Sequence, residues 1–131
     1  MSIGLCMIVK NEEEVLARCL DSAKDVADEI VIVDTGSDDA TIDIAKKYTD
    51  KVYSYRWNFD FAAARNYAFS LSSADYILWL DADDVLLEKD CAALQALKKT
   101  MDGSVNAYFL RYNAAFDEDG NVTMYFFRER I

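Results

Sequence analysis

The chain has 131 residues, of which 53% are hydrophobic and 29% charged, with a formal net charge of −10 and neither histidine nor proline. This composition is typical of a soluble globular domain with one core, and the negative charge argues against nucleic acid or an anionic membrane surface as a partner, because both require basic patches. The absence of histidine also removes the commonest general base and the commonest zinc ligand.

The chain carries no signal for export or membrane insertion. No apolar run reaches the ~18–20 residues that a membrane-spanning helix needs, and the first residues lack the basic segment and long apolar core of a signal peptide. The three cysteines, Cys6, Cys19 and Cys91, show no metal-binding spacing and are interpreted as buried free thiols of a reducing compartment. We therefore expect a cytoplasmic protein.

Four strand-like segments alternate with four segments that carry apolar residues at helical spacing. The predicted strands cover residues 3–9, 29–33, 51–55 and 76–80. The predicted helices cover residues 12–23, roughly 40–48, 61–71 and 87–100, and Asn11 is the expected N-cap of the first. This alternation implies an α/β fold in which helices flank a mainly parallel sheet and the crossovers are right-handed.

The last part of the chain follows a different pattern. Residues 107–113 and 122–128 alternate as strands around the turn-rich segment 117–121, which predicts a C-terminal antiparallel hairpin. No internal repeat or linker interrupts the chain, and the sequence stops within strand-like residues. We therefore expect a single domain, residues 1–131, cut from a longer protein.

The fourth predicted strand ends abruptly at three carboxylates, Asp81, Asp83 and Asp84. A buried parallel strand places such residues at the carboxyl edge of the sheet, where open α/β folds bind their ligands. Carboxylates this close repel one another unless a cation lies among them, and hard oxygen ligands suit Mg²⁺ or Mn²⁺. The pattern indicates a divalent metal that holds a phosphorylated ligand. The alternative is that these acids cap the following helix, although one acid is enough for that.

Two other strand ends should lie at the same edge, because the carboxyl ends of parallel strands point the same way. They carry residues 10–12 and Asp34. Asp34 could accept hydrogen bonds from a ribose hydroxyl or a base N–H, or could bond only to its own turn. Arg65 could pair with a diphosphate or with one of the acids, or could form an ordinary surface ion pair.

Four motifs in this order resemble the family 2 glycosyltransferases. They are Leu-Cys-Met-Ile-Val-Lys-Asn-Glu at residues 5–12, Val-Asp-Thr-Gly-Ser at 33–37, Ala-Arg-Asn at 64–66 and Trp-Leu-Asp-Ala-Asp-Asp at 79–84. The resemblance runs from Ile3 to about Asp90, and the opening motif also resembles bacterial enzymes in which helical repeats of the TPR type often follow this domain. One departure is mild: the family's turn usually reads Gly-Ser-Thr-Asp, whereas here Ser37 is followed by two aspartates.

The resemblance implies a GT-A fold, a nucleotide-sugar donor, inversion at the anomeric carbon and roles for individual residues. The residues implied to lie beside the nucleotide are Asn11, Glu12, Asp34, Arg65 and Asp81. Asp34 would bind the base or ribose, and Arg65 would lie near the base and diphosphate. Asp83, together with Asp81, would ligate the Mn²⁺ or Mg²⁺ that bridges the diphosphate, and Asp84 could assist.

The resemblance also implies that the acceptor half and its carboxylate general base come after this chain ends. Glu118 and Asp119 lie in the predicted hairpin turn and are not assigned that role, so no catalytic base is assigned. We expect the donor-binding half of a hexosyltransferase-like enzyme that uses a nucleotide-diphosphate sugar, with UDP implied by resemblance, and an unknown acceptor that is a saccharide, lipid or protein. The alternative is a nucleotide-sugar-binding module without turnover. A homodimer could cover an exposed sheet edge.

Overall fold

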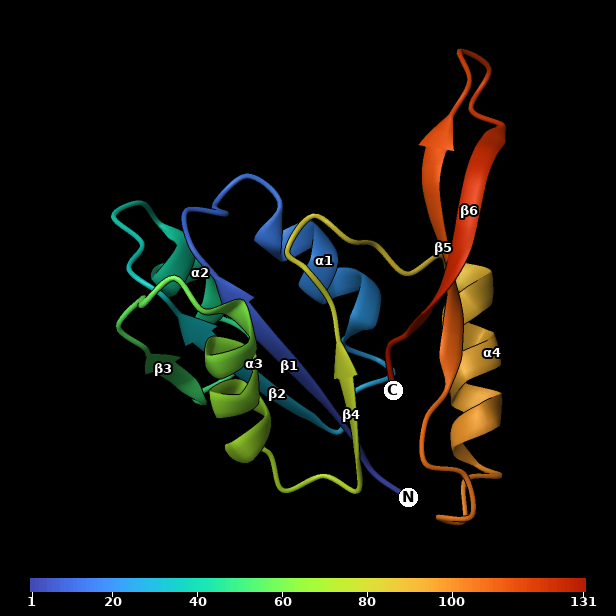
Figure 1. The fold of residues 1–131 in the computed structure, drawn as a ribbon, viewed down its shortest axis with the longest axis horizontal. Helices are drawn as coiled ribbons and strands as arrows, with labels where there is room; N and C mark the ends of the chain where they lie inside the picture. The colour runs from blue at the N-terminus through green and yellow to red at the C-terminus, as the bar shows by residue number, and fades with distance from the viewer.

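A four-stranded parallel sheet, four helices and a separate two-stranded hairpin make up the computed structural model, which describes residues 1–131 (Figure 1). The strands and helices in chain order are β1 (Ile3–Val9), α1 (Leu16–Ala23), β2 (Glu29–Asp34), α2 (Thr41–Ala45), β3 (Val52–Ser54), α3 (Phe61–Ser70), β4 (Tyr76–Trp79), α4 (Glu88–Lys98), β5 (Phe109–Phe116) and β6 (Val122–Glu129). The mainly parallel sheet and the C-terminal antiparallel hairpin predicted from the sequence are both confirmed.

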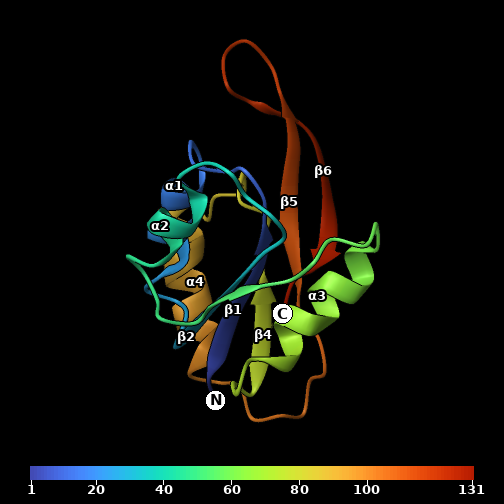
Figure 2. The same cartoon turned by 90° about the vertical axis from the view of Figure 1, so that its left-hand side faces the viewer.

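Strand β1 lies inside the parallel sheet, whose order is β3-β2-β1-β4. Successive side chains of a strand point to opposite faces, and β1 is apolar on both. Leu5 and Met7 pack in the cluster that includes residues of α1, α2 and α4, whereas Cys6 packs with Ala68 of α3. Helix α3 therefore covers one face of the sheet and the other three helices lie on the opposite face (Figure 2). This arrangement explains why β1 reads as an almost continuous apolar run.

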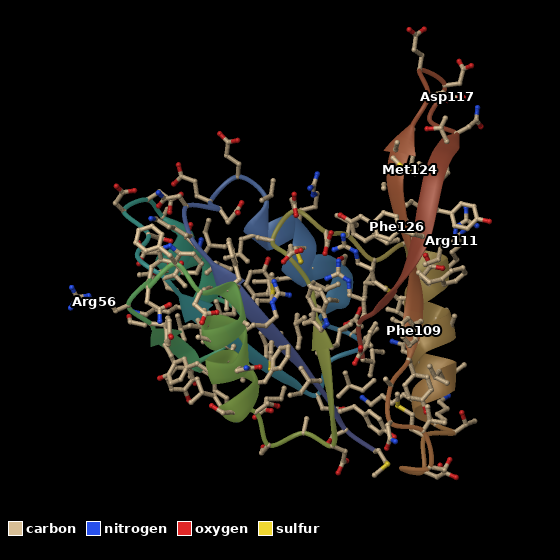
Figure 3. The ribbon with its side chains drawn as sticks, in the orientation of Figure 1. Arg56, Phe109, Arg111, Asp117, Met124 and Phe126 are labelled. Carbon is tan, nitrogen blue, oxygen red and sulfur yellow. The ribbon has the colours of Figure 1, made fainter.

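The hairpin of β5 and β6 projects beyond the sheet, and Figure 3 shows Phe109 and Arg111 along it and Asp117 near its tip. After β6 the chain returns to the edge of β4, where the amide of Trp79 donates to the carbonyl of Arg130 at 3.0 Å. Ile131 is buried in the main core cluster. The base of the hairpin is thus joined to the sheet beside the last residue of β4.

The first two helices are shorter than predicted. Helix α1 begins at Leu16 rather than near residue 12, and Asn11 does not cap it, because Asn11 adopts a left-handed conformation with φ of 51° and bonds to the loop after β2. Helix α2 ends at Ala45 rather than near residue 48. None of the four helices is long and apolar enough to cross a membrane.

All three cysteines are free, as predicted, but they differ in burial. Cys6 and Cys19 are buried, and burial raises the pKa of the Cys6 thiol to about 11 and that of Cys19 to about 12. Cys91, on α4, packs against the edge of the core cluster but is only partly buried, so the prediction of three buried thiols was wrong for this residue.

Candidate functional site

The carboxyl ends of β1, β2 and β4 meet at one edge of the sheet. Val9 is paired with Asp34 at the ends of β1 and β2, and β4 lies on the other side of β1. The chain adds β2 and then β3 on one side of β1, and it afterwards crosses to the other side of β1, where it adds β4. The order in which the parallel strands are added therefore changes side between β1 and β4. Open α/β sheets bind ligands at such a point, so the convergence predicted from the sequence is confirmed.

The loops that follow β1 and β2 are tied together by hydrogen bonds. The amide of Asn11 donates to Oγ of Ser37 at 2.8 Å, and Oδ1 of Asn11 accepts from the amide of Asp38 at 2.9 Å. The amide of Glu12 donates to Oγ1 of Thr41, also at 2.8 Å. The side-chain carbonyl of Asn11 therefore shapes the loop, and this is why the residue is not available to cap α1.

Asp34 uses only one of its two carboxylate oxygens within the protein. Oδ2 accepts hydrogen bonds from the amides of Gly36 and Ser37, both at 2.9 Å, in a turn that requires the φ of 118° found at Gly36. Oδ1 is buried and has no hydrogen-bond partner. Buried acceptors are normally satisfied because leaving one unpaired costs free energy. The local turn bonding considered from the sequence thus accounts for one oxygen of this carboxylate and leaves the other without a partner.

The acids after β4 form a closed turn. The amide of Asp81 donates to Oδ2 of Asp84 at 3.0 Å, and the amide of Asp84 donates to the carbonyl of Asp81 at 2.9 Å. Helix α4 begins only at Glu88, with Leu87 as its N-cap, so the alternative that these acids cap the helix was wrong. Asp83 is exposed, whereas Asp84 is 9% exposed and its Oδ2 lies 3.0 Å from Nη2 of Arg130. The carboxylate of Asp84 is therefore already engaged by contacts within the protein.

Arg65 lies against the same turn. Its Nη2 is 3.1 Å from Oδ1 of Asp81, and its guanidinium carbon is 4.0 Å from the centroid of the Trp79 ring. The side chain of Arg65 is 24% exposed and that of Asp81 43%, so the pair is accessible from solvent. Pairing of Arg65 with one of the acids, one of the alternatives considered from the sequence, is therefore confirmed.

Glu12 lies close enough to these acids for their negative charges to affect its pKa. Its pKa is raised, first by burial and then by the negative charges of Asp83, Asp39 and Asp81. A cation at this edge would relieve the repulsion. No set of three or more His, Cys, Asp or Glu side chains in the structure is arranged to hold a metal ion. Mg²⁺ is commonly held by one or two carboxylates together with substrate phosphates, so Asp81 and Asp83 fit a metal that the phosphates of a ligand help to bind.

The amino-acid sequence matches the model of glycosyl transferase family 2 over residues 5–130. The chain belongs to this family. Among curated relatives, a TPR repeat-containing protein of Synechococcus elongatus is 48% identical over 85 residues, which cover 65% of this chain and 21% of the relative. The glycosyltransferase SunS of Bacillus subtilis is 31% identical over 98 residues, which cover 73% of this chain and 23% of SunS. The implied link to TPR-containing proteins is therefore supported.

Solved structures of glycosyltransferases share the fold of this family 2 chain. Residues 1–349 of Staphylococcus aureus TarS align with a TM-score of 0.59 and 22% identity, covering 76% of this chain and 33% of TarS. Glucosyl-3-phosphoglycerate synthase of Mycobacterium tuberculosis, in complex with Mn²⁺ and uridine-diphosphate-glucose, aligns with a TM-score of 0.55 and 22% identity, covering 63% of this chain and 33% of the synthase. At this identity the likeness shows the fold alone, and the GT-A fold is confirmed.

This family 2 chain spans only 21% and 23% of the length of the two curated relatives named above. The two acids considered and set aside as a general base, Glu118 and Asp119, lie next to Asp117 in the loop between β5 and β6, near the tip of the hairpin in Figure 3. No carboxylate of the chain is therefore assigned as the general base.

Sequence reasoning missed Arg130, which is 2% exposed and contacts both Trp79 and Asp84. Nothing in its immediate sequence distinguishes Arg130 from Arg128, which is exposed on β6. The only available signal was the clustering of acids at residues 81–84, which would require a compensating cation somewhere in the fold.

Proposed function

We propose that the chain binds a nucleotide-diphosphate sugar, with UDP as the nucleotide, at the carboxyl edge of its parallel sheet. The observation that carries the proposal is Oδ1 of Asp34, a buried acceptor without a partner at this edge. A base N–H or a ribose hydroxyl would satisfy it. Membership of glycosyl transferase family 2 and the nucleotide-sugar complex of a structural neighbour support this choice of ligand.

The proposed nucleotide site uses side chains from the loops after β1 and β4, from the last residue of β2 and from helix α3. Asn11 and Glu12 would line it from the loop after β1, and Asp34 would bind the base or ribose. Arg65, now paired with Asp81, would place its positive charge near the diphosphate. A guanidinium suits this role because it donates hydrogen bonds to phosphate oxygens in a fixed planar arrangement.

Asp83 and Asp81 would hold Mn²⁺ or Mg²⁺ together with the diphosphate. When bound, such a metal supplies Lewis-acid stabilisation of the charge on the departing nucleoside diphosphate. The carboxylate of Asp83 is exposed, and the closed turn from Asp81 to Asp84 holds the loop that carries it. Asp84 would contribute indirectly, since its carboxylate is already engaged by Arg130.

The reaction proposed for the complete protein is inverting transfer of a hexose to a saccharide, lipid or protein acceptor. The acceptor site and general base would come from parts of the protein beyond these residues. A second candidate is a nucleotide-sugar-binding module without turnover. Release of hexose from UDP-hexose, to water or to an acceptor, would support the enzyme, whereas metal-dependent binding without any release would support the module.

Calorimetric titration of UDP into the protein, with and without Mn²⁺, tests the proposed site. We expect Mn²⁺-dependent binding that Asp83→Asn removes. Asp43→Asn is the matched control, because Asp43 is an exposed residue of α2 and the substitution removes the same charge. Absence of UDP binding by the folded protein under both conditions would refute the assignment of the donor site to this chain.

A further inference from the structure

Arg130 is a buried charged side chain that does not belong to the proposed ligand contacts. It is 2% exposed and follows directly after β6. Its amide donates to the carbonyl of Tyr108 at 3.1 Å, and its own carbonyl accepts from the amide of Trp79 at 3.0 Å. The backbone of Arg130 is thus held between the base of the hairpin and the last residue of β4, and its side chain reaches Asp84 in the turn after β4.

The guanidinium of Arg130 contacts Trp79, Asp84 and Tyr112. Nη1 donates to the carbonyl of Trp79 at 3.1 Å, and the guanidinium carbon lies 3.9 Å from the centroid of the Trp79 ring. Nη2 lies 3.0 Å from Oδ2 of Asp84, close enough for an ion pair although it is not aligned as a hydrogen bond. Placing such a pair in the interior costs desolvation free energy that its attraction often fails to recover. Its presence therefore points to a role in geometry rather than in stability.

One connection runs from Arg130 through Asp84 to the proposed metal site. The oxygen of Asp84 that faces Arg130, Oδ2, also accepts the amide of Asp81 at 3.0 Å. The guanidinium carbon of Arg130 also lies 5.3 Å from the centroid of the Tyr112 ring, so this residue of β5 packs beside the same ion pair. The position of Asp84 therefore fixes the turn on which Asp81 and Asp83 lie.

A second connection runs through Trp79 to Arg65. The guanidinium carbons of Arg65 and Arg130 lie 4.0 and 3.9 Å from the centroid of the same ring. Both guanidinium groups therefore contact the aromatic ring of Trp79, and cation–π attraction stabilises each of these contacts. Arg65 in turn donates to Oδ1 of Asp81 at 3.1 Å, so both connections end at Asp81.

We propose that Arg130 is a positioning residue for the donor site, which fixes the Asp81–Asp84 turn through Asp84 and the guanidinium of Arg65 through Trp79. This inference rests on the proposed function, because it assigns to Arg130 an effect on metal-dependent nucleotide binding. Arg130 touches no part of the proposed ligand. It links the hairpin, which is remote from the nucleotide site in sequence, to the acids that would hold the metal.

The variants Arg130→Met and Asp84→Asn test the first connection. Loss of a residue that orients metal ligands typically lowers metal affinity by about 10- to 100-fold, and we expect a loss of this size in Mn²⁺-dependent UDP affinity. Because either variant already removes the Arg130–Asp84 ion pair, the double variant should lose no more affinity than the more severe single variant. Arg130→Lys should recover only part of the affinity, since an ammonium can pair with Asp84 but cannot also stack on Trp79 as a planar group.

Arg128→Met is the matched control. Arg128 is exposed on β6, its guanidinium carbon lies 4.8 Å from the centroid of the Phe126 ring, and its substitution removes the same charge two residues earlier. We expect it to leave UDP binding unchanged. Circular dichroism establishes whether each variant is folded, and if Arg130→Met is not, Arg130→Lys and Asp84→Asn carry the test, because both keep most of the packing.

Hydrogen exchange of the Asp81 amide provides a readout that needs no ligand. This amide donates to Asp84, so we expect faster exchange in Arg130→Met and Asp84→Asn than in the wild type and Arg128→Met. Folded variants must show both faster exchange and weaker UDP binding; either one without the other would overturn the proposal. If the wild type bound no UDP, the proposed function would fail, and exchange at Asp81 alone would decide whether Arg130 positions the turn.

Discussion

Substitution of Asp34 by asparagine should separate ligand binding from stability. The carboxylate accepts two backbone amides through Oδ2 and leaves Oδ1 buried and unpaired. An asparagine oxygen can take the place of Oδ2, and its NH₂ group would then replace the open acceptor with a donor. The substitution thus keeps the turn and inverts the hydrogen-bonding character of the position that would face the nucleotide.

The size of both effects follows from these contacts. A neutral amide oxygen is a weaker acceptor than a carboxylate, so each of the two hydrogen bonds contributes about 1 kcal/mol less to stability. Removing a buried charge that has an unpaired oxygen stabilises the folded state by a similar amount. We therefore expect the free energy of unfolding to change by less than about 1 kcal/mol. Loss of one hydrogen bond from a ligand to a charged group costs about 1.5–3 kcal/mol, which corresponds to a decrease in UDP affinity of about 10- to 100-fold.

Urea unfolding and calorimetric titration of UDP measure the two quantities on the same sample. Asp38→Asn is the control, since Asp38 is exposed in the same loop and its substitution removes the same charge; we expect it to change neither quantity. Unchanged UDP affinity in Asp34→Asn would refute the assignment of Oδ1 to a ligand donor. A parallel loss of several kcal/mol in stability would instead show that the carboxylate serves only the turn.

Three further predictions concern charge and packing. Arg65→Met should weaken UDP binding about tenfold and strengthen binding of Mn²⁺ alone, because Asp81 loses the cation now 3.1 Å away; calorimetry that shows weaker Mn²⁺ binding would contradict this. Burial raises the pKa of Glu29, but bonds from Lys51, Ser72 and the amide of Ser73 outweigh it and hold the pKa at about 2, against an ordinary 4.5. The folded-state pKa is lowered, so this stabilisation is present above pH 4.5 and is lost as the pH falls toward 2; Glu29→Gln should flatten that part of the curve of unfolding free energy against pH. Gly4→Ala should destabilise the protein by about 1–3 kcal/mol in urea unfolding, because a methyl group there would collide with Oγ of Ser72, which is bonded to Glu29; wild-type stability would show that Ser72 moves aside.

Much of the fold could be predicted from the sequence because the signals are local. The apolar run at residues 3–9 predicted strand β1 with its observed ends, since a strand buried on both faces needs apolar side chains at every position. Alternation of strands with helices predicted a parallel sheet, and parallel strands necessarily bring their carboxyl ends to one edge. The convergence of Asn11, Asp34 and Asp81 at that edge follows from the same rule.

Only the tertiary structure decided which of these polar groups are bonded within the protein and which are left without a partner. Asn11 was expected to cap a helix but bonds to Asp38 across two loops, and Asp84 resembled its neighbours in sequence but is engaged by Arg130. The unpaired oxygen of Asp34 likewise depends on which donors the folded chain brings to it. Hydrophobic periodicity is set by near neighbours along the chain. The partner of a buried carboxylate such as Asp84 is instead a residue far away in sequence, Arg130, which only the folded chain brings to the end of β4.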